Sequence, residues 1–263
     1  MTILTAAGAF AKAYTDQFDA DIVSIREVGE ATFKERIKKA DIIIHNASTI
    51  NVPDLELSVE LNFDFTRWLI ELVQSSNPSV HIILISSMSL LDPTNENAYG
   101  DVVRMSPYAY SKYLAETYSL KSGLQHLSCV RFSTLFYKQP DRDILSKLIV
   151  DAVTKGKIQL INNGEARRNF LPLVVAARYV QKILEFNKND PTIFNLTAPE
   201  SVSFGDVAAI LRKLLPDLIV ENIEMPVTPP VLSEFTNTSI DTLGRVDFSL
   251  ETEITNYAKS LRP

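Results

Sequence analysis

Three side chains are placed so that they could carry out proton transfer together. The apolar run Val80–Ile85 predicts a buried strand, and Ser86 and Ser87 follow it directly. Tyr108 and Lys112 stand four residues apart in a predicted helix, so they share one helix face. An ammonium beside a phenol favours the phenolate, so we expect Lys112 to lower the pKa of Tyr108. With a cofactor to carry the hydride, these groups could reduce a carbonyl or oxidise an alcohol.

The segment around this tyrosine is more specific than the spacing, because Tyr and Lys four residues apart also occur on solvated helix faces. From Ser106 to Glu116 it reads Ser-Pro-Tyr-Ala-Tyr-Ser-Lys-Tyr-Leu-Ala-Glu. With the strand that ends in Ser-Ser, it resembles the active-site segment of the extended short-chain dehydrogenase/reductase family, the NAD(P)-dependent nucleotide-sugar epimerases, dehydratases and reductases. The resemblance implies that Tyr108 donates the proton, that Lys112 adjusts its pKa and binds the cofactor ribose, and that Ser87 donates a hydrogen bond to the carbonyl.

The first strand leads into a turn that, in the resembled family, binds the pyrophosphate of the cofactor. That turn usually reads Thr-Gly-x-x-Gly-x-x-Gly, whereas here Ala6, Ala9 and Lys12 replace the three glycines. Alanine is the smallest substitute, so the turn can persist with less room for the backbone to approach a cofactor. The resemblance implies that the turn contacts the cofactor through Thr5, Ala6, Gly8, Ala9 and Phe10.

A second cofactor segment is the predicted strand that begins at Asp41. The sequence Asp-Ile-Ile-Ile-His-Asn-Ala-Ser resembles the family's Asp-Val-Val-Ile-His-x-Ala-Ala, whose small residues let the cofactor lie on the backbone. By resemblance we expect Asn46 and Ala47 to lie beside the cofactor. His45 has no ligand partners in the sequence, and we expect a core or loop histidine without a catalytic role.

The choice between the two nicotinamide cofactors depends on the end of another predicted strand, Asp21–Ile25. Arg26 stands where an acidic residue would bind the ribose hydroxyls of NAD, and an arginine there can pair with the 2′-phosphate of NADP. We therefore favour NADP(H) over NAD(H). Glu27 follows immediately, and a shift of one residue would reverse this choice.

Composition excludes several other classes of function. The 263 residues are 46% hydrophobic and 22% charged, and their net charge of −6 comes without a block of basic residues, so nucleic acid is not an expected partner. No apolar run approaches the roughly 20 residues that span a bilayer, so no membrane partner is expected. The single cysteine, Cys129, lies in an apolar run, and a cytoplasmic location is expected. No metal-ligand cluster is present in the sequence.

Five positions bear on the substrate and the reaction. Family members that dehydrate the sugar carry Asp-Glu directly after the hydroxyl residue, whereas Met88 and Ser89 follow Ser87 here, which disfavours a dehydratase. Arg168 lies in a segment that resembles the family's Gly-Glu-x-x-Arg-Asp-Phe, whose arginine contacts the nucleotide diphosphate. Thr134 replaces an asparagine of the family's pattern. The expected substrate contacts are Ser87, Ser89, Thr134 and Arg168.

Alternating strands and helices predict an α/β protein with a Rossmann-like, doubly wound parallel sheet. We expect a dinucleotide-binding domain over residues 1–136, to which 169–196 return, and a smaller α/β substrate-binding region over 137–263. The helix at 31–40 follows the second strand so closely that the sheet should have one strand fewer than is usual in the family. A strand is expected over 127–137, and a loop at 225–230 is expected at the substrate entrance.

The resemblance also implies a partner and a reaction. A long helix over 53–74, with Asn62 packed behind the active site, would form a homodimer surface together with the helix that carries Tyr108. The favoured reaction is the reduction of a keto group, at C4, on a nucleotide-activated sugar. Two alternatives stay open: an epimerase that keeps its NAD tightly bound, and a catalytically silent family member, which the missing glycines favour.

Overall fold

The computed structural model describes residues 1–50, 52–92, 95–186, 190–226 and 239–262. The chain forms two compact units. The first contains Met1–Phe132, Ala177–Leu196 and a short segment with α10 (Ile240–Leu243), and the second contains the remainder. The first unit ends at Phe132 instead of the expected 136, and the returning segment begins at Ala177 instead of 169. The first of these differences has a local reason, because the strand expected over 127–137 is interrupted at Ser133.

The first unit is built on a six-stranded sheet in the order β12-β7-β4-β3-β1-β2, and every neighbouring pair of strands is parallel. The strands are β1 (Thr2–Leu4), β2 (Asp21–Ile22), β3 (Ile42–His45), β4 (His81–Ser87), β7 (Leu127–Phe132) and β12 (Thr192–Leu196). The chain moves outward from β1 to β2 and then crosses to β3 on the other side, so the order reverses between β1 and β3. The predicted Rossmann-like, doubly wound fold is confirmed.

All residues between β2 and β3 are described, and they form only helices, α2 (Ile25–Val28) and α3 (Glu30–Lys39). This agrees with the expectation that no further strand fits there. β2 is shorter than the strand expected over 21–25, because the chain turns into α2 at Ile25. Arg26 therefore lies in the first turn of a short helix and not at the end of a strand.

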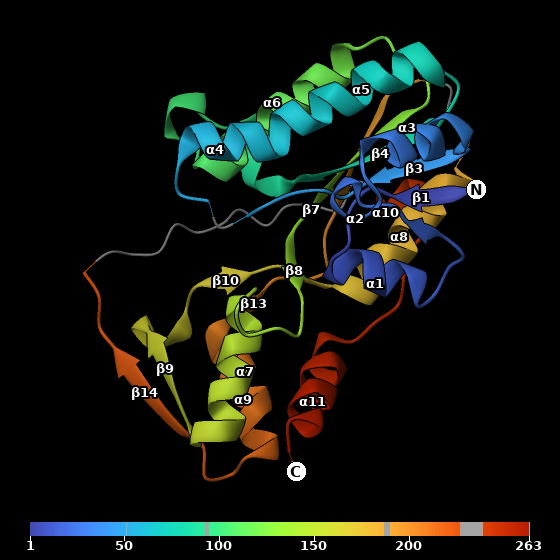
Figure 1. The fold of residues 1–263 in the computed structure, drawn as a ribbon. Coiled ribbons are helices and arrows are strands. Elements are labelled where there is room, and N and C mark those ends of the chain that lie inside the picture. Colours follow the sequence, from blue (N-terminus) through green and yellow to red (C-terminus); the bar gives the residue numbers. More distant parts are fainter. Residues whose placement is uncertain (51, 93–94, 187–189, 227–238, 263) are drawn as a thin grey trace. The chain divides into compact units, whose positions relative to one another are not determined.

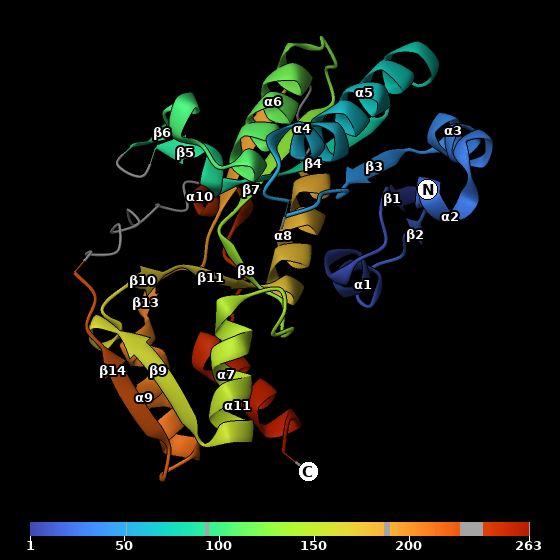
Figure 2. The same cartoon turned by 60° about the vertical axis from the view of Figure 1, so that its left-hand side comes forward.

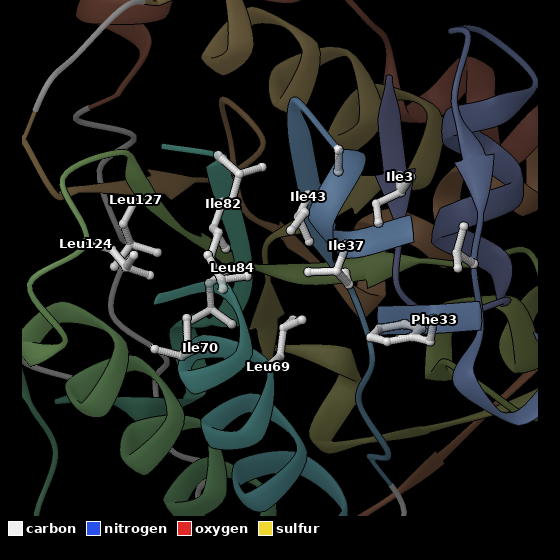
Figure 3. Packing of buried hydrophobic residues seen from close by; sticks show 14 of the residues in the cluster. Ile3, Phe33, Ile37, Ile43, Leu69, Ile70, Ile82, Leu84, Leu124 and Leu127 are labelled. Carbon is white, nitrogen blue, oxygen red and sulfur yellow. The ribbon is translucent and has the colours of Figure 1, made fainter. Parts of the chain in front are cut away.

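Helices cover both faces of this sheet (Figures 1 and 2). On one face lie α3, α5 (Phe65–Ser76) and α6 (Pro107–Lys121), and on the other lie α1 (Ala9–Thr15) and α8 (Leu173–Glu185). Figure 3 shows how the first face packs, with α3 and α5 placing aromatic and aliphatic side chains on the strands. The buried set includes Phe33, Ile37, Leu69, Ile70, Ile3, Ile43, Ile82, Leu84 and Leu127. Strands covered on both faces read as continuous apolar runs, which is why β3 and β4 are rich in isoleucine.

The helix expected over 53–74 is continuous but not uniform. α4 (Leu55–Val59) passes into a π-helical segment, Glu60–Asp64, before α5 begins. Asp54 caps the start of α4 by accepting a hydrogen bond from the backbone N–H of Leu57 at 2.8 Å. Single π-helical turns are frequent at functional sites, and this one carries the buried Asn62.

A hairpin, β5 (Leu91–Asp92) and β6 (Asn95–Tyr99), follows β4 and leads to α6 (Figure 2). α6 begins where its sequence dictates, because Ser106 accepts a hydrogen bond from the backbone N–H of Ala109 at 3.2 Å and Pro107 occupies the first helical position. Tyr108 is therefore held in the first turn of a well-capped helix.

The described residues of the second unit form short paired strands and the α-helices α7, α9 and α11 (Figure 2). The pairs are β8 (Thr134–Phe136) with β11 (Phe170–Pro172), β10 (Arg167–Arg168) with β13 (Val202–Ser203), and β9 (Lys157–Ile161) with β14 (Ile219–Ile223). The helices are α7 (Ile144–Lys155), α9 (Phe204–Leu214) and α11 (Leu250–Ser260). The side chain of Ser203 caps α9 by accepting a hydrogen bond from the backbone N–H of Asp206. In the loop expected at 225–230, residues 227–230 lie outside the described part of the chain.

Within the described ranges, no helix is long and apolar enough to cross a membrane. The same residues contain no group of three histidine, cysteine or acidic side chains that could hold a metal ion.

Candidate active site

Two of the predicted catalytic residues meet at the carboxyl end of β4. The hydroxyl of Tyr108 is hydrogen-bonded to the side chains of Ser87 and Ser48. Ser87 Oγ also lies 2.9 Å from Ser89 Oγ and accepts a hydrogen bond from the Ser89 backbone N–H at 3.1 Å. Ser87 is thus close enough to Tyr108 to affect its pKa, and the catalytic roles of the two residues stay a prediction.

Lys112 lies one turn further along α6, but its ammonium is directed to the backbone of β4. Its Nζ donates a hydrogen bond to the carbonyl oxygen of Ile85 at 2.7 Å. Burial lowers the pKa of Lys112 to about 8, while Glu116 and, more weakly, Cys129 favour its charged form. The ammonium is thus bound to Ile85, which lies two residues before Ser87 on β4.

The expectation that Lys112 lowers the pKa of Tyr108 is wrong for this structure. Burial raises the pKa of Tyr108 above its usual value, and the hydrogen bonds from Ser87 and Ser48 only partly oppose that rise. The ammonium of Lys112 donates its printed hydrogen bond to the carbonyl oxygen of Ile85, and burial determines the direction of the Tyr108 pKa shift. A phenol with a raised pKa keeps its proton at neutral pH, which suits a proton donor.

A cavity of about 430 Å³ opens at the carboxyl ends of β1, β2 and β3. Ala6, Ala47 and Ser48 line it from the ends of β1 and β3, and Arg26, Glu27 and Glu60 line it with charged groups. In open parallel sheets, ligands bind outside the carboxyl ends of the strands where the order reverses. The small side chains leave the floor open, and the volume lies in the range of small-molecule sites, so these residues fit part of a dinucleotide.

The other residues expected at the cofactor are placed differently. Gly8 precedes α1 and is exposed, and it is not among the residues that line the cavity. Phe10 is buried, and its ring packs on Phe132 with the ring centres 5.8 Å apart. Ala9 begins α1 and also lies outside the cavity lining. Contacts of these three residues with a cofactor stay a prediction.

Thr5 and Asn46 hold the first turn through their side chains. Asn46 Oδ1 accepts from the backbone N–H of Ala6 at 3.0 Å, and Asn46 Nδ2 donates to the carbonyl of Ala6 at 2.8 Å. Thr5 Oγ1 lies 2.8 Å from His45 Nδ1, and His45 Nε2 lies 2.9 Å from Thr66 Oγ1. His45 is therefore a core histidine, as expected, and burial lowers its pKa to about 3. Both backbone polar groups of Ala6 are used by the asparagine, so the turn is fixed without the family's glycines.

Asn46→Ala tests this role of the turn. It removes both hydrogen bonds to Ala6, so we expect about 1–2 kcal/mol less free energy of unfolding and about tenfold weaker binding of NADH and NADPH. Urea unfolding and fluorescence titration measure the two effects. Asn77→Ala is the matched control, because Asn77 also makes two hydrogen bonds to backbone, to Ile37 and Ala40, at the amino end of the strands. It should lose stability and keep cofactor affinity, and equal losses of affinity in both variants would contradict the assigned role.

Asn62 joins the loop after β3 to the helix of Tyr108. Its side chain accepts from the backbone N–H of Thr49 at 2.7 Å and donates to the carbonyl of Thr49 at 3.0 Å and to Ser111 Oγ at 3.0 Å. Ser111 Oγ in turn donates to the carbonyl oxygen of Tyr108 at 2.8 Å. The predicted position of Asn62 behind the active site agrees with these contacts.

Thr134 and Arg168, the remaining predicted substrate contacts, belong to the second unit. Thr134 begins β8, and Arg168 lies on β10. Arg168 is half-buried, burial lowers the pKa of its guanidinium, and no described residue forms an ion pair with it. A guanidinium in such surroundings suits an anionic ligand, and the substrate roles of both residues stay a prediction.

Comparison with known proteins identifies the family. Residues 7–197 match the model of the NAD dependent epimerase/dehydratase family. The chain belongs to this family. It is a family of NAD-dependent enzymes of the short-chain dehydrogenase/reductase type, as the segment around Tyr108 predicts. No curated protein matches the sequence significantly.

Solved structures of the family share the fold over the whole chain. The NAD-dependent NDP-hexosamine 5,6-dehydratase TunA of tunicamycin biosynthesis is 19% identical, with 98% of this chain and 97% of that chain covered and a TM-score of 0.78. UDP-glucose 4-epimerase of Thermotoga maritima is 16% identical, with 98% of both chains covered and a TM-score of 0.77. A dTDP-4-dehydrorhamnose reductase of Clostridium acetobutylicum is 18% identical, with 99% of both chains covered and a TM-score of 0.78.

Sequence reasoning missed two residues at the site of this family member. Ser48 stands where the family's pattern has the second alanine of Ala-Ala, and its hydroxyl bonds to Tyr108. The departure from the pattern was visible, but nothing local indicated which way the hydroxyl points. Glu60 lines the cavity with Arg26, although the two residues lie on different elements. Only the fold brings these two residues together.

Proposed function

We propose that this protein reduces a keto group, at C4, on a nucleotide-activated sugar, with NADPH or NADH as the hydride donor. The observation that carries the proposal is the hydrogen bond between Tyr108 and Ser87 at the end of β4, with a tyrosine that keeps its proton. A reductase needs an acid that can give a proton to a developing alkoxide, and a buried phenol with a raised pKa meets that need.

The proposed roles follow from the side chains present. When bound, the nicotinamide cofactor supplies a hydride to the carbonyl carbon. Ser87 donates a hydrogen bond to the carbonyl oxygen, and Tyr108 gives that oxygen its proton, which yields the alcohol and a phenolate. The ammonium of Lys112, buried near this pair on the same helix, favours the phenolate once it forms and is available to a ribose hydroxyl.

The residues after Ser87 argue against dehydration. Met88 is buried and has no group that titrates, and the hydroxyl of Ser89 is hydrogen-bonded to Ser87. Eliminating water needs an acid and a base in addition to the tyrosine. Neither residue supplies one. The dehydratase TunA therefore serves as a relative in fold and not as a guide to the reaction.

The nucleotide-sugar substrate is proposed on two grounds. The solved structures with this fold include enzymes of UDP-glucose and of dTDP-4-dehydrorhamnose. Arg168 offers a half-buried guanidinium, whose fork of donors suits the oxygens of a diphosphate. A homodimer is also proposed, supported by Leu55 and Leu57, which are exposed on α4. Sedimentation equilibrium would test the dimer.

The central experiment titrates the purified protein with NADPH and NADH and then adds a nucleotide 4-ketosugar. Consumption of the reduced cofactor with the ketosugar supports the reductase. If NAD co-purifies with the protein and sugar epimers are interconverted, the protein is an epimerase and not a reductase. If neither cofactor binds at millimolar concentration, the protein is a silent family member.

For the cofactor, we propose a preference for NADP(H), supported by Arg26 at the cavity. Arg26→Gln should then weaken NADPH binding about tenfold and leave NADH binding unchanged, because a charge-assisted hydrogen bond to a phosphate is worth about 1.5–3 kcal/mol. Calorimetric titration of both cofactors measures the two affinities. Glu27→Gln is the control on the same helix. If Glu27→Gln weakens NADH binding while Arg26→Gln changes nothing, the preference is for NAD(H).

A further inference from the structure

A buried ion pair lies one helical turn beyond Lys112. Glu116 on α6 is fully buried, and Arg131 on β7 donates to both of its carboxylate oxygens, with Nε 3.1 Å from each. Tyr99 adds a hydrogen bond from its hydroxyl to Glu116 Oε1 at 2.9 Å, and its ring lies beneath the guanidinium of Arg131. The carboxylate is thus fixed in place by three donors from two other elements.

Packing alone does not explain this arrangement. A buried ion pair gains little stability over well-packed apolar side chains of the same volume, because both charges lose their hydration. Tyr108, Lys112 and Glu116 follow one another at intervals of four residues and so share one face of α6. The position of the carboxylate beside Lys112 is therefore the feature to be explained.

The groups that face Lys112 leave Glu116 as its counter-charge. On β3, His45 is held neutral, because burial lowers its pKa to about 3. On β7, burial raises the pKa of the Cys129 thiol well above its usual value. Tyr108, on the same helix, also keeps its proton. Among the described residues around Lys112, Glu116 is the carboxylate that raises the pKa of Lys112 and so favours its charged form.

We propose that Glu116, held by Arg131 and Tyr99, is a positioning residue that keeps Lys112 charged in its buried site. The proposal rests on the proposed function of Lys112 and deepens it. Without the carboxylate, an ammonium buried against β4 would lose its proton near neutral pH, and the charge that favours the Tyr108 phenolate would be lost. Glu116 itself touches neither substrate nor cofactor in this account.

Glu116→Gln tests the proposal through the pH dependence of folding. The pKa of Lys112 is about 8 in the folded chain and has a usual value of 10.5. Between these values the unfolded chain holds a proton that the folded chain has lost, so the free energy of unfolding should rise with pH across that window. The rise begins at the pKa of Lys112 in the folded chain, and we call this pH its lower edge. In Glu116→Gln the lower edge should be lower by about one pH unit. Lys112→Met identifies which part of the rise belongs to Lys112.

Three further variants separate charge from packing. Glu116→Asp keeps the carboxylate and should restore most of the wild-type profile. Tyr99→Phe keeps the carboxylate but removes a hydrogen bond to it, and should lose some stability without moving the edge. If Glu116→Gln does not fold because Arg131 is left unpaired, Glu116→Gln/Arg131→Met removes that charge and should show a smaller shift in the same direction.

The result for Glu116→Gln can be distinguished from the result of the experiment that tests the reductase reaction. Where turnover is measurable, its decline on the alkaline side should move to lower pH by the same amount in Glu116→Gln. Without turnover, the unfolding profile still decides, because it needs no substrate. A uniform loss of stability at every pH, with the edge unmoved, would show that Glu116 only packs the core and would overturn the proposal.

Discussion

Tyr108→Phe should lower the rate of NAD(P)H oxidation with a nucleotide ketosugar by about 10²–10⁴-fold, the usual contribution of a positioned proton donor. The variant removes one oxygen atom, and with it the hydrogen bonds to Ser87 and Ser48. The ring and the capped first turn of α6 remain. Affinity for the cofactor should therefore change little. Steady-state kinetics and fluorescence titration measure the rate and the affinity separately.

Tyr110→Phe provides the matched control for this experiment. Tyr110 lies two residues later on the same helix, and its ring stacks on Tyr113. Removing its hydroxyl should leave both rate and affinity close to wild type. A rate in Tyr108→Phe within a few-fold of wild type would show that another group supplies the proton.

Lys112→Met should give a protein that is more stable and nearly inactive. Methionine fills a similar volume without a charge, whereas the ammonium of Lys112 is buried and has a pKa of about 8 instead of 10.5. Keeping that side chain charged costs the folded state about 3 kcal/mol below pH 8. After allowance for the hydrogen bond to Ile85, we expect the free energy of unfolding at pH 7 to increase by about 2 kcal/mol. Urea unfolding measures this gain.

The gain in the free energy of unfolding of Lys112→Met should decrease as the pH rises. A lysine whose pKa is lowered by folding destabilises the folded state while both states are charged, and this penalty fades between pH 8 and pH 10.5. The difference between Lys112→Met and wild type should therefore be largest below pH 8 and vanish above pH 10.5. Lys121→Met, at the exposed end of the same helix, should show neither the gain nor the loss of turnover. A Lys112→Met variant that is less stable than wild type at pH 7 would contradict the account.

Much of the fold could be predicted because its signals are local. The isoleucine runs that become β3 and β4 are typical of strands buried on both faces, and Ser106-Pro107 is a typical helix start. The errors also have local causes. The strand expected over 127–137 is interrupted at Ser133, after which β8 pairs with β11 and not with the main sheet. The π-helical segment around Asn62 does not alter the apolar spacing, so the sequence pattern reads as a uniform helix.

The candidate site could be predicted in part, for a different reason. The spacing of Tyr108 and Lys112 determines that they share a helix face, but not which atoms their side chains reach. Lys112 donates to the carbonyl oxygen of Ile85, and burial makes the pKa of Tyr108 higher than usual instead of lower. Asn46 binds the backbone of Ala6, an interaction between two strands that no local pattern contains. Such contacts depend on strand order and register, which only the folded chain specifies.

The transfer of deuterium from the reduced cofactor to the sugar is a direct test of the proposed hydride transfer. The purified protein is supplied with NADPH or NADH deuterated at the reactive carbon of the nicotinamide, together with a nucleotide 4-ketosugar, and the product is analysed by mass spectrometry and NMR. We expect an alcohol that carries deuterium on the former carbonyl carbon, formed by wild type and by Tyr110→Phe but scarcely by Tyr108→Phe. A product without deuterium, or equal labelling by Tyr108→Phe, would contradict this expectation.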